Sequence, residues 1–238
     1  MKKLTESDKI RFTRHISLPE VGIEGQERLK NARVLVIGAG GLGSPLLTYL
    51  AAAGIGHITI VDDDVVSLGN LQRQILYGTN DLGKKKVHLA QARINEIYPE
   101  TEVVCHDSRI NPENANELIP GADVVVDCTD NYKTRELLGE KTRQFAVPLV
   151  FASVLNYEAQ VTVFNYQGGA CLADLFPDLP PDGLFQENEI GLMGVLPGVA
   201  GTLQASEVLK IIVGHGEVLS GKLLVFSLLE NRFNVFRY

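Results

Sequence analysis

The residues most able to do chemistry begin with glycines at Gly38, Gly40 and Gly43, directly after the apolar run at 34–37. Glycines at this spacing allow a tight turn between a strand and a helix, where backbone N–H groups can approach a phosphate. The helix dipole and the unpaired donors of a helix N-terminus favour negative charge there. The turn predicts a nucleotide site, although the turn alone also fits a strand–helix connection that binds nothing.

Acidic and basic residues follow the next apolar run, at 58–61. Asp62 lies 19 residues after Gly43, where such folds place a carboxylate against ribose hydroxyls. Asp62 to Asp64 would repel a phosphate-rich ligand, but cations follow within 25 residues at Arg73, Lys84, Lys85 and Lys86. The guanidinium of Arg73 could hold phosphate bidentately, whereas each of Lys84 and Lys85 also fits an ordinary surface charge.

Asp130 and Asn131 follow the apolar run at 123–128. Open α/β sheets bind ligands outside the carboxyl ends of their strands, so both residues are expected on the same edge as Gly40 and Asp62. A carboxylate beside a triphosphate is a natural Mg²⁺ ligand. Asp130 also fits the N-cap of a helix beginning at Tyr132, and the two roles are compatible.

The pattern of apolar runs predicts a Rossmann-like, doubly wound, mainly parallel α/β sheet, because parallel neighbours need helical crossovers. Two short helices are expected within 5–31, ahead of this core. The expected strands are 33–37, 57–61, 101–106, 123–128 and 148–152, and the expected helices are 42–53, 84–97, 112–119 and 132–144.

The rhythm changes after Phe151. The runs at 160–164 and 222–226 predict antiparallel strands, and 231–238 can pair with the second run as a hairpin. Between them lies a long irregular segment, from Tyr166 to about Leu196, and then a helix that runs from about Pro197 to Val213. A loop of this length in a compact domain is usually functional or mobile. The sequence therefore predicts a C-terminal antiparallel extension.

Composition narrows the class of protein. A chain of 238 residues with 45% hydrophobic and 21% charged residues fits one large α/β domain. The net charge of −7 argues against non-specific nucleic-acid binding. There is no signal-like start and no uninterrupted apolar stretch of about 18 residues, so a cytoplasmic protein without membrane spans is expected. Cys105, Cys128 and Cys171 are too few and too scattered for a disulfide framework, and the first two are expected to be buried.

Taken together, these motifs resemble the ubiquitin-activating-like adenylyltransferases, the HesA/MoeB/ThiF family. The resemblance covers essentially the whole chain and suggests one domain, 1–238, with N-terminal helices at 1–31, a nucleotide-binding core at 32–153 and a crossover and carrier-binding part at 154–238. It rests on Arg14, the turn at 38–44, Asp62 with Asp64, the segment 70–74, Lys86, the segment 127–131 and the segment 191–198.

The resemblance implies a homodimer that binds Mg²⁺ and ATP and activates the C-terminal Gly-Gly carboxylate of a small ubiquitin-like sulfur carrier. The tail would attack the α-phosphate and release pyrophosphate, for sulfur transfer in molybdopterin or thiamine biosynthesis. Arg14, Arg73, Lys86 and Asp130 would be catalytic; Arg14 would reach across the dimer interface, and Asp130 would hold Mg²⁺. The nucleotide site would comprise Gly38, Gly40, Gly41, Leu42, Gly43, Asp62, Asp64, Asn70, Arg73, Gln74, Lys86, Asp130 and Asn131.

Two departures from this family limit what is carried over. Many relatives hold a structural zinc with two Cys-x-x-Cys pairs; this chain has neither pair, so no such site is predicted. The cysteine that some relatives carry in the crossover loop is replaced here by Glu187, and a carboxylate cannot exchange sulfur. The reaction is therefore expected to stop at adenylation, with Cys171 as an alternative nucleophile.

Other functions stay open on the sequence alone. Arg14 also fits an ordinary charge on a helix surface. The missing cysteines suit a protein that binds nucleotide or carrier without turnover. An NAD-dependent oxidoreductase could use the same fold, although the sequence offers no well-placed His or Lys as a hydride-transfer partner.

Overall fold

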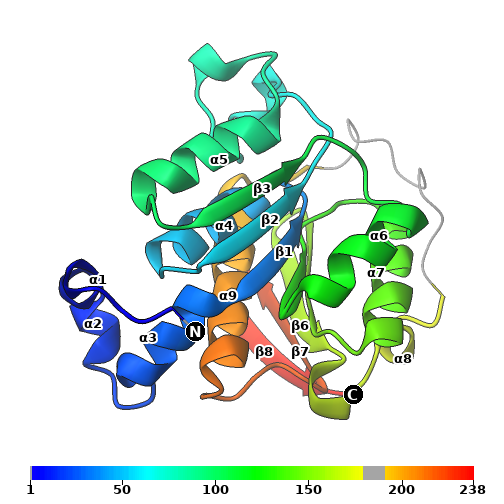
Figure 1. Cartoon of the computed structure of the whole chain (residues 1–238). Helices are drawn as coiled ribbons and strands as arrows, with labels where there is room; N and C mark the ends of the chain where they lie inside the picture. Colours follow the sequence, from blue (N-terminus) through cyan, green and yellow to red (C-terminus); the bar gives the residue numbers. More distant parts are fainter. Residues whose placement is uncertain (1, 179–190) are drawn as a thin grey trace.

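The computed structural model describes residues 2–178 and 191–238, and these form one mixed sheet of eight strands in the order β3-β2-β1-β4-β5-β6-β7-β8 (Figure 1). The first five strands in this order are parallel to one another, and β6, β7 and β8 each pair antiparallel with the strand before them. The predicted fold class is confirmed. The strands are β1 Arg33–Ile37, β2 His57–Val61, β3 Glu102–His106, β4 Val124–Asp127, β5 Leu149–Leu155, β6 Glu158–Phe164, β7 Lys222–Ser227 and β8 Arg232–Arg237.

Helices cover both faces of the parallel strands, which explains why those strands are apolar on both sides. Val34 and Val36 of β1 enter one core cluster, while Leu35 and Ile37 enter the other. Figure 1 shows α4, α5 and α9 on one face and α6 and α7 on the other. The bounds are α4 Gly43–Ala52, α5 Lys86–Ile97, α6 Pro112–Leu118, α7 Tyr132–Phe145 and α9 Val195–Val213.

By length and composition, α9 could cross a membrane, but it is a cover helix of the sheet. It packs against α4, β5 and β6. Its buried Gln204 donates a hydrogen bond from Nε2 to the carbonyl oxygen of Asp127 on β4, at 2.7 Å. The apolar contacts explain the hydrophobic character of the helix, and this bond satisfies the polar side chain buried among them.

The N-terminal region differs from the sequence prediction, because residues 2–31 form three helices rather than two. They are α1 Glu6–Arg11, α2 Thr13–Ile16 and α3 Gly22–Asn31. Phe12 separates the first two with φ −97° and ψ 17°, while its buried ring packs edge-on against Tyr98 at 5.4 Å. Burial of the Phe12 ring in the core thus coincides with the break between α1 and α2.

A buried polar cluster fixes these helices to the rest of the domain. Asp8 of α1 pairs with Lys30 of α3 and accepts a hydrogen bond from the Tyr98 hydroxyl at 2.6 Å. Lys30 also pairs with Glu100, with Nζ and Oε2 2.9 Å apart. The cluster ties α1 to α3 and to the turn between α5 and β3.

Some predicted element ends shift in the structure. The helix expected from 84 begins at Lys86, because Lys85 is extended and bridges to Val65. The segment expected to be irregular contains a short helix, α8 Leu172–Leu175. The hairpin at the C-terminus is confirmed, with Ser227 paired to Arg232 across a turn that holds Asn231 at φ 52°.

Candidate nucleotide site

The glycine turn joins β1 to α4 at the carboxyl edge of the parallel strands. Gly38 has φ 96°, and a Cβ there would lie 2.6 Å from the carbonyl oxygen of Cys128. A Cβ on Gly43 would lie 2.2 Å from the carbonyl oxygen of Gly38. These two glycines are required by the fold itself, because a side chain at either position would collide with the backbone.

Gly40 is different, because the chain leaves room for a side chain there. Its conformation is not left-handed, and the nearest atom to an added Cβ is Gln74 Nε2, at 3.5 Å. No side chain caps the first turn of α4, whose N-cap is the buried Leu42. The carbonyl oxygen of Gly40 accepts the N–H of Ser44 at 2.9 Å. A small residue at a helix N-terminus that no side chain caps suits the close approach of a phosphate.

Ala39, inside the turn, is held from both sides. Its N–H donates to Asp62 Oδ2 at 2.7 Å, and its carbonyl oxygen accepts a hydrogen bond from the Tyr77 hydroxyl at 2.7 Å. Asp62 Oδ1 accepts a second hydrogen bond, from the N–H of Asp64 at 2.9 Å. The turn is therefore positioned by Asp62, the residue predicted to bind ribose, and by Tyr77, which no sequence motif singles out.

Burial acts on both of these side chains. It raises the pKa of the Asp62 carboxyl, and the hydrogen bonds from Ala39 and Asp64 and the charge of Lys86 only partly oppose it. It also raises the pKa of the Tyr77 hydroxyl, helped by the nearby charges of Asp62 and Asp64. Tyr77 thus stays a neutral hydrogen-bond donor to the turn.

Lys86 places a buried ammonium group at the same edge. The residue is 3% exposed and begins α5, and its Nζ donates to Asp64 Oδ2 at 2.8 Å. Asp64 is itself 61% exposed, so this one ion pair faces solvent. A buried cation with a solvent-facing partner is suited to bind a second anion.

The segment predicted to hold phosphates lies over the glycine turn. The Cγ atom of Arg73 lies 3.4 Å from the position of a Cβ on Gly41, and its Nη1 donates to the carbonyl oxygen of Gly69 at 3.0 Å. Gln74 is buried, and its Oε1 lacks a hydrogen-bond partner within the described chain. Asn70 accepts the backbone N–H groups of both residues on its carbonyl oxygen. These bonds fold the segment into a tight turn, and Arg73 places that turn against Gly41.

Asp130 emerges exposed at the end of β4, and it is not the cap of the following helix. The N-cap of α7 is Asn131, whose Oδ1 accepts the N–H of Thr134 at 3.0 Å. The capping alternative for Asp130 was therefore wrong. The side-chain oxygen of Asn131 is already used in this cap.

A buried ion pair supports the turn that presents Asp130. Asp127 is fully buried and accepts the N–H and hydroxyl of Thr129 at 2.9 and 2.7 Å. Arg135 of α7 donates to the carbonyl oxygen of Thr129 at 2.8 Å, and its Nε lies 3.7 Å from Asp127 Oδ2. Burial raises the pKa of Asp127, and the charge of Arg135 opposes that shift. Neither residue was selected from the sequence as a site residue.

The one predicted site residue that the chain does not bring to this edge is Arg14. It lies exposed on α2, which packs on α3. Neighbouring His15 contacts Gln26, and Gln26 donates to the carbonyl oxygen of Ala53, just before β2 begins. Arg14 thus lies near the amino ends of the strands, at the end of the sheet away from the nucleotide site of its own chain.

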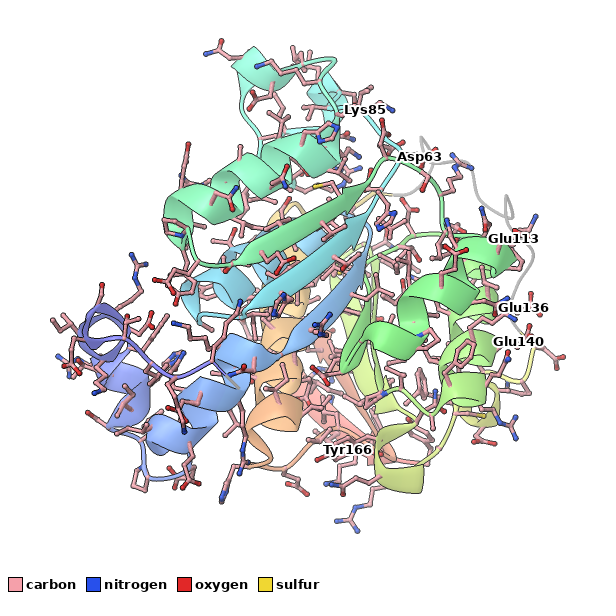
Figure 2. The ribbon with its side chains drawn as sticks, in the orientation of Figure 1. Asp63, Lys85, Glu113, Glu136, Glu140 and Tyr166 are labelled. Carbon is pink, nitrogen blue, oxygen red and sulfur yellow. The ribbon has the colours of Figure 1, made fainter. Side chains whose placement is uncertain are left out.

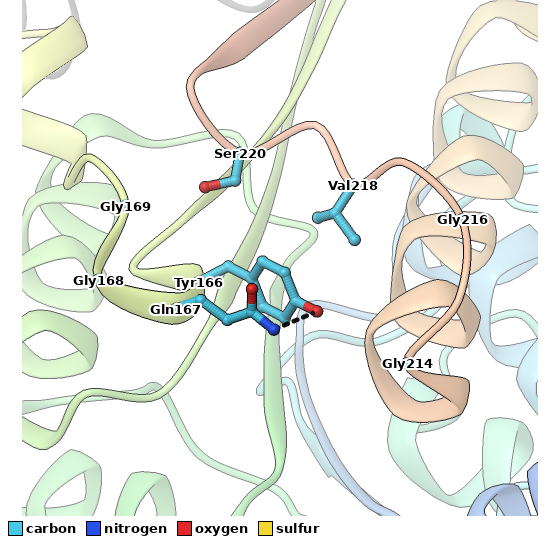
Figure 3. A pocket seen from close by; sticks show the side chains of 8 residues that line it. All are labelled: Tyr166, Gln167, Gly168, Gly169, Gly214, Gly216, Val218 and Ser220. Atoms are coloured by element: carbon cyan, nitrogen blue, oxygen red, sulfur yellow. Dashed lines mark hydrogen bonds between the residues drawn. The ribbon is translucent and has the colours of Figure 1, made fainter.

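A hollow of about 530 Å³ lies at that same end of the sheet, beyond β6 and α9 (Figure 3). The side chains lining it carry no charge, and Gln167 Nε2 donates to the Tyr166 hydroxyl inside it at 3.1 Å. A triphosphate needs cations, so this hollow does not compete with the carboxyl edge. Its lining residues are Tyr166, Gln167, Gly168, Gly169, Gly214, Gly216, Val218 and Ser220.

The cysteines give no exposed nucleophile in the described chain. Cys171 is 6% exposed at the start of α8, and Cys128 is buried. Cys105 was expected to be buried but is half-buried, and burial raises the pKa of its thiol. Glu187, the predicted replacement for the crossover cysteine, lies outside the described residues. Residues 2–178 and 191–238 contain no group of three or more His, Cys, Asp or Glu side chains suited to a metal ion, and the predicted lack of zinc stays a prediction.

A comparison with known families decides the affiliation of the chain. The model described as "ThiF family" matches residues 12–238. The chain belongs to the ThiF family. Within it, the chain is 43% identical over 235 residues to the sulfur carrier protein adenylyltransferase of Thermus thermophilus, covering 96% of this chain and 87% of that protein. The resemblance inferred from the motifs is confirmed.

Longer relatives match this ThiF-family chain over only part of their length. The adenylyltransferase and sulfurtransferase MOCS3 of Drosophila sechellia is 44% identical over 226 residues, which are 94% of this chain and 50% of that protein. The chain thus spans half of this relative. Among solved structures, the crystal structure of PaaA superposes with a TM-score of 0.84 at 25% identity, over all of this chain and 75% of the other. These similarities do not favour the oxidoreductase alternative.

Proposed function

We propose that this protein is an ATP-dependent adenylyltransferase that activates the C-terminal carboxylate of a small, ubiquitin-like sulfur carrier ending in Gly-Gly. The product is an acyl-adenylate on the carrier, and pyrophosphate leaves. The names of its ThiF-family relatives, which include a sulfur carrier protein adenylyltransferase, support this proposal. We also place the protein in the cytoplasm, in a sulfur-transfer pathway such as molybdopterin or thiamine biosynthesis.

One observation carries the proposal: the uncapped N-terminus of α4, the carboxylate of Asp62 and the cation of Lys86 share one edge of the sheet. A nucleotide bound here would lay its phosphates on the glycine turn and its ribose on Asp62. Arg73 and Lys86 would then supply positive charge to the phosphates, with Asn70 and Gln74 closing the turn from above. Each group has a separate part of ATP to bind.

The chemistry of this edge suits carboxylate activation. The tail carboxylate of a carrier is ionised at neutral pH, so no general base is needed. The reaction requires positioning of that weak nucleophile against the α-phosphate and neutralisation of the developing charge. Lys86 and Arg73 can do the second through electrostatic attraction alone, with no proton transfer.

Asp130 fits the role of an Mg²⁺ ligand. Its carboxylate is exposed at the end of β4 and is not occupied as a helix cap. Mg²⁺ commonly takes one or two protein carboxylates and completes its shell with water and phosphate oxygens. Held there, Mg²⁺ would neutralise part of the triphosphate charge. Arg135 and Asp127 would keep the turn that presents Asp130 in place.

The distance of Arg14 from the site of its own chain supports a homodimer. If Arg14 is catalytic, it must act on the nucleotide site of a second copy, where its guanidinium would neutralise phosphate charge. Mixing Arg14→Ala and Arg73→Ala variants tests this, because a mixed dimer retains one site with both arginines. We expect each variant to be inactive alone and the equilibrated mixture to recover about a quarter of wild-type activity by random pairing. An inactive mixture of correctly folded dimers would contradict the role of Arg14 in trans.

ATP–pyrophosphate exchange in the presence of MoaD-like or ThiS-like carriers tests the activity. We expect exchange that depends on the carrier and is abolished when its last glycine is removed. Asp130→Ala should reduce exchange by at least about a hundredfold without lowering Tm, because its side chain is exposed. Glu140→Ala is the matched control, since that carboxylate is 69% exposed on α7 (labelled in Figure 2). Absence of exchange with every Gly-Gly carrier would leave only a binding function.

A further inference from the structure

The segment that follows β3 lies directly beside the predicted ribose carboxylate. The last residues of β2 and β3, Val61 and His106, are register partners. The N–H of Asp62 donates to the carbonyl oxygen of His106 at 3.2 Å. Residues 107–110 therefore leave the sheet next to Asp62 and Asp63.

Polar contacts fix this segment against its neighbours. Lys85 Nζ donates to the carbonyl oxygen of Asp63 at 2.9 Å and pairs with Asp107 at 2.8 Å. Figure 2 shows Asp63 and Lys85 close together at this end of the molecule. Asn114 Nδ2 donates to the carbonyl oxygen of Arg109 at 2.9 Å, which anchors the other end of the segment to α6. The backbone of Arg109 is thus held on both sides.

The side chain of Arg109 projects from this anchored segment at the site edge. Its Nε donates to Asp63 Oδ2 at 2.9 Å, while the side chain is 81% exposed. Within the described residues, its two terminal nitrogens make no hydrogen bond. The bond to Asp63, and more weakly the charges of Asp64 and Asp130, raise the pKa of Arg109. The guanidinium therefore lies within reach of carboxylates that follow both β2 and β4.

The stability of the fold does not explain this arrangement. Exposed ion pairs contribute little to folding, because water screens the charges and long side chains lose entropy. Another arginine with such a pair, Arg93 with Glu96 on α5, lies on the surface of a helix. Arg109 instead stands at the carboxyl edge, with the faces of its planar group accessible.

The covalent order of a nucleotide, from phosphate to ribose to base, indicates which part of the ligand would lie near Arg109. Phosphates on the glycine turn lie beside β1, and a ribose on Asp62 lies beside β2. The base continues in the same direction, and the next strand in the sheet is β3. A purine bound in this orientation reaches the segment 107–110, where Arg109 extends from the protein.

We propose that Arg109, aligned by its bond to Asp63, stacks its guanidinium on the purine ring of the bound nucleotide and contributes to nucleotide affinity. The inference rests on the proposed function, because it assumes ATP at this edge. A guanidinium is planar and weakly hydrated, so it stacks on aromatic faces, and the charge adds a cation–π attraction. Stacking tolerates any purine, so Arg109 should strengthen ATP and GTP binding alike.

Equilibrium binding to full-length protein separates base contact from charge. The probes are ATP, GTP and inorganic tripolyphosphate, each with Mg²⁺; tripolyphosphate carries the charge but has no base. For Arg109→Ala we expect the Kd of ATP and of GTP to rise about tenfold and that of tripolyphosphate to stay within twofold. Asp63→Asn should weaken ATP binding less, and Arg93→Ala should change none of the three.

Steady-state ATP–pyrophosphate exchange is a second test of the role of Arg109. Because the base does not react, Arg109→Ala should raise KM for ATP and leave kcat within twofold. The inference is overturned if tripolyphosphate binding falls by the same factor as ATP binding, or if ATP binding does not change. If the wild-type protein binds no ATP, the proposed function fails as well, so the two failures are distinguishable.

Discussion

Lys86 and Lys30 are both buried lysines, and they differ in how their charge is satisfied. Lys30 lies at the amino end of the sheet between Asp8, itself 2% exposed, and Glu100. Lys86 lies at the carboxyl edge, and within the described chain its Nζ bonds only to Asp64, which is 61% exposed. Lys30 therefore has one buried carboxylate partner besides Glu100, which is 49% exposed, whereas the single partner of Lys86 is largely exposed to water.

We interpret this difference as the one between a structural charge, Lys30, and the proposed binding charge, Lys86. A buried ion pair such as Lys30–Asp8 adds little net stability, but breaking it leaves an unpaired buried charge, which is strongly destabilising. A buried cation whose partner is solvated can accept a further anion at small cost. Burial of a lysine alone would not distinguish these roles; the exposure of its partner does.

The largest expected effects come from replacing each lysine with methionine. Lys86→Met should reduce ATP–pyrophosphate exchange about a thousandfold while lowering stability little, because Asp64 stays solvated. Lys30→Met should lower the free energy of unfolding by about 3 kcal/mol, because it leaves Asp8 buried without its cation. The exchange rate of the folded fraction should stay near that of the wild type.

Denaturant unfolding and exchange assays on both variants check this contrast. Met is close to Lys in length, so lost packing contributes little to either result. The proposed difference between the two lysines is contradicted if Lys86→Met destabilises the protein as much as Lys30→Met does, or if Lys30→Met loses activity while still folded.

A smaller effect is expected from Tyr77→Phe, which removes the hydroxyl that holds the glycine turn. The carbonyl oxygen of Ala39 then loses a 2.7 Å hydrogen bond inside the protein. Stability should fall by about 1.5 kcal/mol. Because the turn is also the proposed phosphate site, the Kd of ATP should rise as well, whereas Tyr49→Phe, at an exposed tyrosine on α4, should change neither quantity. An unchanged Kd would show that Asp62 alone is enough to position the turn.

The smallest expected effect concerns the pH dependence of the N-terminal cluster. Burial tends to raise the pKa of Asp8, but Lys30 and the hydroxyl of Tyr98, with help from Thr5, hold it well below its usual 3.8. A lowered folded-state pKa stabilises the protein above about pH 4, and this stability is lost as the pH falls toward the folded value. At pH 3 the wild type should have lost about 1 kcal/mol of this contribution.

Urea unfolding of the wild type and of Asp8→Asn from pH 7 to pH 3 measures how much the ionised Asp8 contributes to the free energy of unfolding. The stability difference between them should be constant down to about pH 5 and should shrink below pH 4. A difference that does not change with pH would mean that Asp8 titrates alike in the folded and unfolded states.

The sequence predicts the parallel half of the fold well, because apolar runs and glycines report directly on buried strands and tight turns. The glycine turn, Asp62 and Asp130 lie at one edge as expected, since all of them follow strands whose carboxyl ends must meet there, and Lys86 at the start of α5 joins them through its ion pair with Asp64. The nucleotide-binding and catalytic roles of these residues stay predictions.

The residues that the sequence missed act through partners distant in the chain. Tyr77 bonds to Ala39, 38 residues away, and Asp8 bonds to Tyr98, 90 residues away. The split between α1 and α2 at Phe12 comes from contact with Tyr98 in the same way. Arg109 has an ordinary surface composition around it, and only the strand order places it beside Asp63.

The proposed adenylation is tested most directly by following the α-phosphate of ATP. The protein is incubated with Mg²⁺, ATP labelled at the α-phosphate and a carrier that ends in Gly-Gly, and the products are separated after acid quenching. We expect label on the wild-type carrier together with released pyrophosphate, and no label on a carrier that lacks its last glycine. Release of ADP and phosphate, or an unlabelled carrier in the presence of bound ATP, would contradict the proposed function.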